Sequence, residues 1–301
     1  MKHQHTIKDK IMKTFKKLLL VSAMSTVLAA CGGSEQASSS STAQPAQAEA
    51  QKASAPANNV PVAADNYVSP LPANAPTVNV ATVGKTLPFS FSDNAGQLIG
   101  MDVDVIRKIG EEAGFKVQFH KKPWVNMLDS VETGESDLAI SGISYTDERE
   151  KKYAISNSYA FNPSSLMFIR EDLNGKVKDL SSLEGLTVGV LGESKQDSQI
   201  TAANKAKSIV RYNSTYLLFT GMLKKEVDVI AQDSLLLNQL AKTNTEYKTF
   251  SVNYENESEP SARLVILVNK DKVQLRDDIN KALAKIKEDG TLAKIEEKWL
   301  K

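Results

Sequence analysis

Residues 78–301 alternate short apolar strand patterns with amphipathic helix patterns, and this alternation restricts the fold more than any other feature of the chain. The predicted strands cover 78–81, 116–119, 137–140, 166–169, 186–190, 226–230 and 264–268. The clearest helix patterns cover 101–113, 126–133, 215–223 and 275–286. Gly114 and Gly290 stand where glycine commonly ends a helix. Strands separated by helices predict an α/β fold with largely parallel sheets, in which ligands bind at the C-terminal ends of the strands.

The first thirty residues predict a secretion signal. Lys16 and Lys17 precede an apolar run, 18–30, that ends in small residues, which is the arrangement of a signal peptide. The run is too short for a membrane span, which needs about 20 apolar residues. The segment before Met12 is longer than a usual charged region, so Met12 is an alternative start.

Cys31 is the sole cysteine and directly follows Leu28-Ala29-Ala30. This segment resembles the bacterial lipobox, in which the cysteine is diacylated and becomes the mature N-terminus. The alternative is a plain signal peptide with an incidental cysteine. Because two acyl chains are enough for stable anchoring, the resemblance predicts a lipoprotein held on a membrane in the periplasm or at the cell surface.

Residues 31–77 are rich in Ser, Ala, Gln and Pro and poor in large apolar side chains. Such a segment buries too little surface to fold, so we expect a disordered tether with a reach of roughly 35–40 Å. An alanine-rich helix is the alternative, and the scattered prolines disfavour it.

Charge and composition exclude several classes of function. The chain has 37 basic and 36 acidic residues, a formal net charge of +1, which gives no electrostatic reason to expect nucleic acid as a partner. One cysteine permits neither an internal disulfide nor a cysteine-based metal cluster. Two of the three histidines lie in the predicted signal segment. We therefore expect no metal and no cofactor.

Three segments resemble, in the same order, motifs of the family 3 (polar amino acid) solute-binding proteins of ABC importers. They are 97–104 (QLIGMDVD), 141–149 (SGISYTDER) and 289–299, which begins DGT and ends KW. Each segment alone is weak, whereas the three together are specific. The resemblance covers about residues 78–301.

The resemblance implies a two-lobe periplasmic-binding-protein-like fold of type II. Each lobe is expected to be a central sheet flanked by helices, and two hinge strands are expected to join them. Lobe 1 would comprise 78–163 and 258–301, and lobe 2 would comprise 164–257. An amino acid would bind between the lobes, which close over it by a hinge motion.

The same resemblance assigns three site residues in lobe 1. Arg149 would grip the ligand's α-carboxylate with two parallel hydrogen bonds, which lysine cannot copy. Gly142 and Ser144 would contact the ligand's ammonium and carboxylate groups. The alternatives are a surface arginine paired with Asp147 or Glu148, and an ordinary turn with a helix cap.

Lobe 2 is expected to supply Asp233, Ser194 and Lys195. Asp233 would pair with the ligand's ammonium group, and its alternative role is to cap the following helix. Asp228 is a weaker candidate for the same role. Ser194 and Lys195, with Gln196, fall in the loop where relatives often carry Thr-Thr-Gln, and backbone N–H groups at the start of the following helix would bind the carboxylate. A solvated loop is the alternative, with Lys195 pointing into water.

Trp124 and Thr86 are expected to line the ligand's side-chain pocket. Trp124 stands where relatives place an aromatic or apolar residue, and core packing is the alternative. Many relatives have an aromatic residue where this chain has Thr86, and an acid where it has Val83. The missing acid disfavours a cationic ligand, so we expect a neutral or polar amino acid.

The resulting hypothesis is a monomeric substrate-binding lipoprotein that delivers an amino acid to an ABC transporter permease and performs no chemistry. One alternative is a periplasmic enzyme of the same fold, such as a dehydratase. It would need a general acid or base over the ligand, and no histidine is expected there. The other alternative is a ligand-sensing surface lipoprotein.

Overall fold

The computed structural model describes residues 67–300. The predicted signal peptide, Cys31 and the predicted tether as far as residue 66 lie outside the described residues. Among the helices of residues 67–300, none is both long enough and apolar enough to cross a lipid bilayer.

The C-terminal end of the predicted tether packs on the folded part of the chain. The hydroxyl of Tyr67 donates to a Glu111 carboxylate oxygen at 2.5 Å, and the Arg107 guanidinium lies 4.4 Å from the centre of the Tyr67 ring. The Lys116 ammonium donates to the carbonyl of Ala73 at 2.6 Å. Residues 67–76 therefore contact the folded part of the chain, because an aromatic ring and backbone carbonyls in this segment find partners that composition does not reveal.

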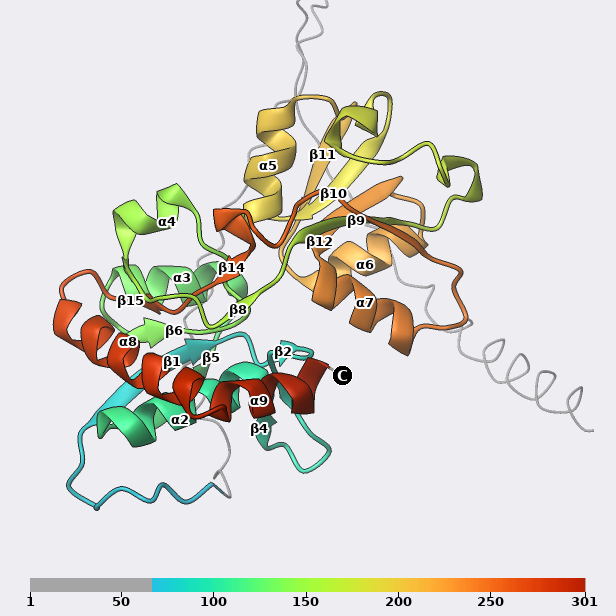
Figure 1. Cartoon of the computed structure of the whole chain (residues 1–301). Coiled ribbons are helices and arrows are strands. Elements are labelled where there is room, and N and C mark those ends of the chain that lie inside the picture. Colours follow the sequence, from blue (N-terminus) through green and yellow to red (C-terminus); the bar gives the residue numbers. More distant parts are fainter. Residues whose placement is uncertain (1–66, 301) are drawn as a thin grey trace, which may run out of the picture. The chain divides into compact units, whose positions relative to one another are not determined.

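The first sheet has the strand order β5-β1-β6-β15-β7 (Figure 1). Its strands are β1 (Thr77–Thr82), β5 (Lys116–Lys121), β6 (Leu138–Ala139), β7 (Ala154–Ile155) and β15 (Leu267–Val268). β1 pairs in parallel with β5 and β6, whereas β15 is antiparallel to both of its neighbours. We call this sheet and the elements packed on it lobe 1.

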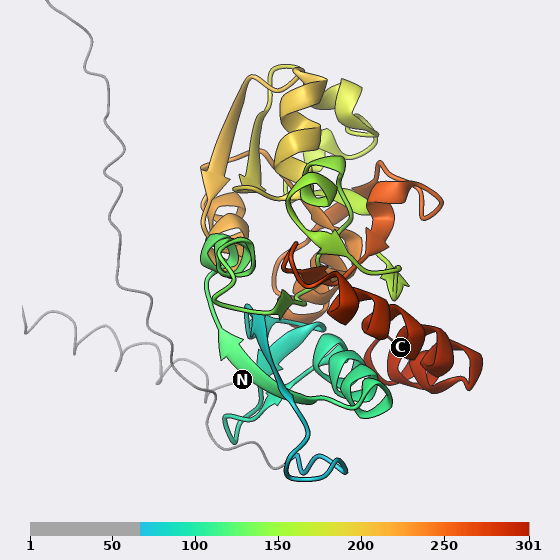
Figure 2. The same ribbon diagram turned by 90° about the vertical axis from the view of Figure 1, so that its left-hand side faces the viewer.

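Five helices belong to lobe 1. They are α2 (Met101–Ala113), α3 (Trp124–Glu132), α4 (Asp147–Lys152), α8 (Val273–Glu288) and α9 (Thr291–Leu300). α2 ends at Gly114, whose left-handed backbone has a φ of 82°, as expected of a glycine cap. Helices α8 and α9 from the end of the chain pack against α2 in both views (Figures 1 and 2), and a shared apolar core joins them. A small antiparallel sheet contains β2 (Lys85–Thr86), β3 (Ser90–Ser92) and β4 (Leu98–Ile99).

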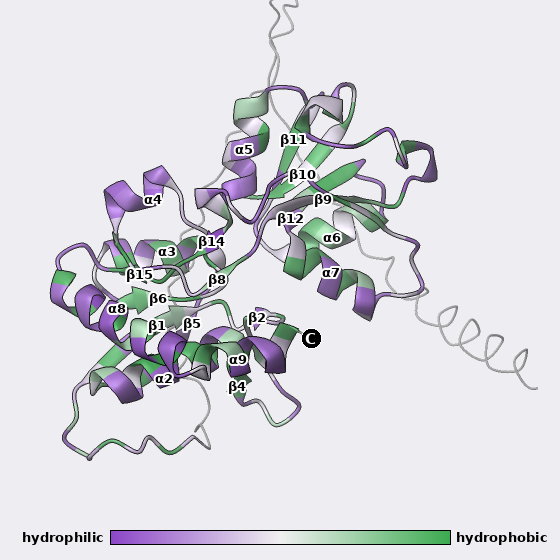
Figure 3. Ribbon diagram, in the orientation of Figure 1, coloured by the Kyte–Doolittle hydropathy of each residue, from purple (hydrophilic) through white to green (hydrophobic). Residues whose placement is uncertain are grey.

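The second sheet has the order β11-β10-β12-β9-β13 and defines lobe 2. Its strands are β9 (Ser164–Phe168), β10 (Thr187–Leu191), β11 (Ser208–Tyr212), β12 (Val229–Asp233) and β13 (Phe250–Asn253). Its helices are α5 (Lys195–Ala203), α6 (Thr215–Leu223) and α7 (Ser234–Thr243), with short 3-10 turns η1 (Glu171–Leu173) and η2 (Leu180–Leu183). In Figure 3 β10 and β11 are coloured as hydrophobic and α4 as hydrophilic, so the apolar residues gather in the sheets.

Two segments carry the chain between the lobes. β8 (Ala160–Phe161) leads into β9, and the 3-10 turn η3 (Pro260–Ala262) leads from lobe 2 into β14 (Arg263–Leu264). β8 and β14 pair with each other in an antiparallel two-stranded sheet. The backbone N–H of Asn162 extends this pairing by donating to the carbonyl of Ala262 at 2.7 Å.

Two strand predictions are wrong in detail. The predicted strand 264–268 is two short strands, β14 and β15, which pair with different sheets because the chain enters lobe 1 at this point. The sheets are mixed, since β9, β13 and β15 run antiparallel to their neighbours. The spacing of apolar residues predicts that a segment forms a strand, but not whether the strand runs parallel or antiparallel to its neighbours.

Candidate functional site

Arg149 is the third residue of α4, in lobe 1, and is buried although the first two residues of the helix are exposed. The helix begins at Asp147 because the Thr146 hydroxyl accepts the backbone N–H of Arg149 at 3.2 Å, a standard N-cap. The side chain is 7% exposed. Its Nη1 donates to the carbonyl of Ser144 at 2.7 Å, and its Nη2 donates to the carbonyl of Glu193 in lobe 2 at 3.3 Å. The alternative of a surface arginine is therefore wrong.

The Arg149 guanidinium keeps its charge in this buried position. Burial lowers the pKa of Arg149 to about 10, and Asp233 is the foremost of the acidic groups that oppose the lowering. The guanidinium carbon lies 5.4 Å from the centre of the Trp124 ring, within the range of a cation–π interaction. The guanidinium is a cation at neutral pH, donates to two carbonyls and faces an aromatic ring. It is suited to bind an anionic group by donating to that group in place of those carbonyls.

The backbone conformation at position 142 and the nearby Phe89 ring both require glycine there. Its φ is 62°, and a Cβ at this position would lie 2.7 Å from a ring carbon of Phe89. Its N–H donates to the Asp102 carboxylate at 2.6 Å. Ser144, two residues further on, is 3% exposed, and its carbonyl holds Arg149. Gly142 and Ser144 thus shape the loop that carries the arginine.

The support beneath Gly142 was not predicted from the sequence. The Asp102 carboxylate is completely buried in α2 and also accepts the Tyr159 hydroxyl at 2.8 Å. Burial raises the pKa of Asp102 to about 7, although the hydrogen bonds from Tyr159 and Gly142 oppose the rise. The signal was present in the motif at 97–104, where an aspartate stands on the apolar face of a helix.

Asp233 of lobe 2 is the last residue of β12 and directly precedes α7. It occupies the N-cap position of α7 but makes no capping hydrogen bond with its side chain in the described structure. The carboxylate instead accepts Nε2 of Gln196 at 2.9 Å and lies 3.6 Å from the Lys195 ammonium. Burial raises the pKa of Asp233, while Lys195 and Gln196 work against the rise. The carboxylate is therefore free from the capping role proposed as its alternative.

The loop before α5 brings Glu193 and Ser194 to the site. The hydroxyl of Ser194 accepts the backbone N–H of Asp197 at 3.1 Å and caps α5. Glu193 has a φ of 59°, a conformation that favours glycine, and its carbonyl faces Arg149. No sequence motif indicates Glu193, because its contribution is made by the backbone.

Lys195 does not point into water. Its side chain is 3% exposed, and its ammonium donates to the Glu255 carboxylate at 2.7 Å. It reaches the segments that cross between the lobes, where sequence analysis had singled out no residue. The structure thus places Lys195 beside the site, with its charge compensated by a neighbouring acid.

The two predicted pocket residues have different surroundings. Trp124 begins α3 and packs in an apolar cluster with Val83 and Tyr145, and its indole N–H is buried without a hydrogen-bond partner among the described residues. Thr86 pairs with Ser90 between β2 and β3. No described contact joins Thr86 to the charged groups.

Other candidate sites on the described residues lack comparable features. A cavity of about 350 Å³ is lined by residues of the loops near the hinge, including Lys178, Tyr254 and Glu257, and by none of Arg149, Trp124 and Asp233. Within residues 67–300, no cluster of three or more His, Cys, Asp or Glu side chains is arranged to hold a metal ion.

Two α/β lobes joined by two crossing segments, with Arg149 of one lobe bonded to the other, define a two-lobed binding protein of type II periplasmic-binding-protein fold. Residues 78–301 match the family of bacterial extracellular solute-binding proteins, family 3, and the chain belongs to this family.

Individual relatives agree with this placement. The chain is similar to the arginine-binding periplasmic protein of Mannheimia haemolytica, with 27% identity over 71% of this chain and 86% of the relative. Its structure resembles that of an ancestral arginine-binding protein bound to glutamine, with 28% identity, a TM-score of 0.68 and coverage of 74% of this chain and 97% of the other. It also resembles an ancestral amino acid-binding protein that is a precursor of cyclohexadienyl dehydratase, with 27% identity, a TM-score of 0.66 and coverage of 75% and 96%.

Proposed function

We propose that this chain is the substrate-binding component of an amino acid ABC importer and captures the amino acid between its lobes. The observation that carries the proposal is the pair of opposite charges, Arg149 from lobe 1 and Asp233 from lobe 2, both largely removed from water. An α-amino acid carries a carboxylate and an ammonium group on the same carbon atom. It is therefore complementary to such a pair, and its binding requires that both lobes contribute.

The hydrogen bonds of Arg149 also explain how the two lobes close over the ligand. Arg149 bonds the neutral carbonyls of Ser144 and Glu193, and a carboxylate is a stronger acceptor than either. Replacement of the Glu193 carbonyl by the ligand keeps the guanidinium satisfied while the ligand takes its place between the lobes. We propose lobe boundaries at 78–163 with 258–301, and 164–257, with 67–77 added to lobe 1.

The side-chain pocket favours a neutral or polar amino acid. Val83 is apolar and packs against the same core cluster as Trp124, whereas an acid would be needed at this position to balance a cationic side chain. The Lys195 charge is balanced by Glu255, so it does not call for an acidic ligand. Some relatives are named for arginine, which agrees with an amino acid as the ligand of this chain. Which amino acid they bind is a property of those proteins.

A thermal-shift screen of the purified protein against the twenty amino acids and cystine, followed by calorimetry, tests the proposal. A ligand present at 100 times its dissociation constant adds about 2.7 kcal/mol of stability, and we expect this from one neutral or polar amino acid. Tight binding of arginine would refute the ligand class. A panel without any ligand would refute the amino acid assignment.

An enzyme of the same fold is the second candidate, favoured by the similarity to a dehydratase precursor. Asp102, whose pKa suits proton transfer, is completely buried with both oxygens bound to Tyr159 and Gly142. His120 bonds Asn79 at the edge of the lobe 1 sheet. These contacts support a binding protein, and recovery of the bound ligand chemically unchanged, measured by NMR after prolonged incubation, would agree with it.

We also propose a lipid anchor on Cys31, a tether that ends before Tyr67, and a monomer that works with a membrane permease. The substitution Cys31→Ser removes the thiol that carries the acyl chains, so the protein should move from the membrane fraction to the soluble fraction of the cell. Fractionation and labelling with radioactive palmitate measure this. An unlabelled wild-type protein, or a variant that stays with the membrane, would contradict the anchor.

A further inference from the structure

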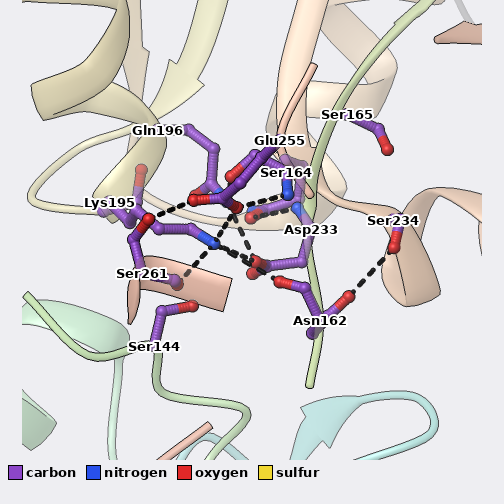
Figure 4. Close-up of polar contacts among 12 residues, drawn as sticks. Ser144, Asn162, Ser164, Ser165, Lys195, Gln196, Asp233, Ser234, Glu255 and Ser261 are labelled. Atoms are coloured by element: carbon purple, nitrogen blue, oxygen red, sulfur yellow. Dashed lines mark hydrogen bonds and ion pairs between the residues drawn. The ribbon is translucent and has the colours of Figure 1, made fainter. Parts of the chain in front are cut away.

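The Lys195 ammonium lies where the chain crosses between the lobes. It donates to the carbonyl of Asn162 at 3.3 Å and to the carbonyl of Ser261 at 2.9 Å, so it touches both crossing segments (Figure 4). Its third partner is the Glu255 carboxylate at 2.7 Å, with Asp233 further off at 3.6 Å. An ammonium group has three protons. These are taken up by protein acceptors, which leaves none for a ligand.

The Glu255 carboxylate also binds groups in the region where the chain crosses between the lobes. It accepts the backbone N–H of Ser164, at the start of β9, at 2.7 Å. It also accepts the hydroxyl of Ser261 and the Gln199 amide, the latter at 3.0 Å. Burial works to raise the pKa of Glu255, but the charge and hydrogen bond of Lys195, together with the hydrogen bonds from Ser261 and Ser164, outweigh it, so the pKa lies below its ordinary value. A carboxylate with its side chain 1% exposed is thus kept ionised by one lysine and its hydrogen-bond donors.

The pair connects three pieces of the molecule that are far apart in sequence. Lys195 opens α5 and follows Glu193 and Ser194, the loop that meets Arg149. Gln196, the next residue, holds Asp233 and also donates to the Ser164 hydroxyl at 3.0 Å. The lobe 2 half of the site is therefore fastened directly to both crossing segments.

We propose that Lys195, with Glu255, is a positioning residue that fixes the lobe 2 half of the site to the hinge and so limits the movement of the lobes to one bending motion. The bend then occurs on the lobe 1 side of Asn162 and Ser261. Its role in ligand capture rests on the proposed function, whereas its effect on lobe movement does not.

The test measures distances between the lobes of the full chain without added ligand. Spin labels are placed at two exposed positions, Val273 in lobe 1 and Tyr216 in lobe 2, in a Cys31→Ser background that removes the sole cysteine. Lys195→Met alone leaves Glu255 buried and unpaired, which is strongly destabilising. The informative variant is therefore Lys195→Met with Glu255→Gln, which removes both charges. Lys248→Met, which breaks an exposed pair with Glu171 in lobe 2, is the matched control.

We expect pulsed electron resonance to give a distance distribution at least about twofold wider in the double variant, because motion at the hinge is no longer restricted. The control should match the unaltered protein. An unchanged width in a folded double variant would overturn the proposal, since a merely structural pair would alter stability without altering the width.

Hydrogen exchange on the unaltered protein gives a second readout that does not depend on the variants folding. The amide of Ser164 and its neighbours in the crossing segments should exchange as slowly as those of β10. Exchange as rapid as in the exposed turn 245–246 would overturn the proposal even if the double variant did not fold. Neither measurement uses a ligand, so failure of the amino acid panel and failure of this inference remain distinguishable.

Discussion

Arg149→Ala is expected to weaken binding of the identified amino acid by about 30-fold or more. Removal of one partner of a buried, hydrogen-bonded charge pair costs about 2–5 kcal/mol, and each 1.4 kcal/mol is tenfold in affinity. The Arg149 side chain is buried and faces Trp124, so water does not replace the lost guanidinium. Arg149→Lys should also bind weakly, because an ammonium group cannot form the two parallel bonds of a guanidinium.

Calorimetry with the amino acid selected by the screen measures this loss. Arg276→Ala is the matched control, since Arg276 is an arginine of α8 in lobe 1 that pairs with Asp277 at the surface. Its removal should leave affinity within about threefold, as expected of a surface interaction. Equal affinities for Arg149→Ala and the unaltered protein would show that the ligand does not bind to this arginine.

Asp102 is expected to make the protein less stable as the pH rises from about 4 to about 7. In this window the folded protein retains the Asp102 proton, because burial raises its pKa to about 7, while the unfolded chain has lost it at the ordinary value of 3.8. The unfolded state therefore binds fewer protons, and stability falls with rising pH. At 1.36 kcal/mol for each pKa unit, the change reaches at most about 4 kcal/mol.

Asp102→Asn isolates this contribution. The asparagine oxygen can accept the Gly142 N–H, and its amide can donate to the Tyr159 hydroxyl, so both contacts remain. Urea unfolding at pH 5 and pH 8 should show the variant gaining about 2–4 kcal/mol relative to the unaltered protein at the higher pH. Asp172→Asn, an exposed carboxyl whose pKa is lowered by Arg170, should show no such gain. A constant difference between Asp102→Asn and the unaltered protein at both pH values would contradict the assignment.

The sequence predicted the type of most elements. It also predicted Arg149 from its motif, and Asp233 from its position in the family, as site residues, and the structure buries both side chains. The sequence was less informative about Lys195, because a cationic side chain in a loop is expected to be solvated. Burial of that lysine depends on Glu255, 60 residues away, and no local pattern links the two.

The sequence alone determined features that depend on residues a few positions apart. These are most of the strands and helices from Thr77 onward, the glycine at the end of α2, and the motif that carries the arginine. Tertiary structure decided which strands run antiparallel, where the chain crosses between lobes, and that Tyr67 packs on α2. It also decided that Asp102 lies under Gly142 and that Lys195 joins both crossing segments. These features depend on groups that meet only after the chain has folded, because burial and pairing of charge are properties of the assembled core.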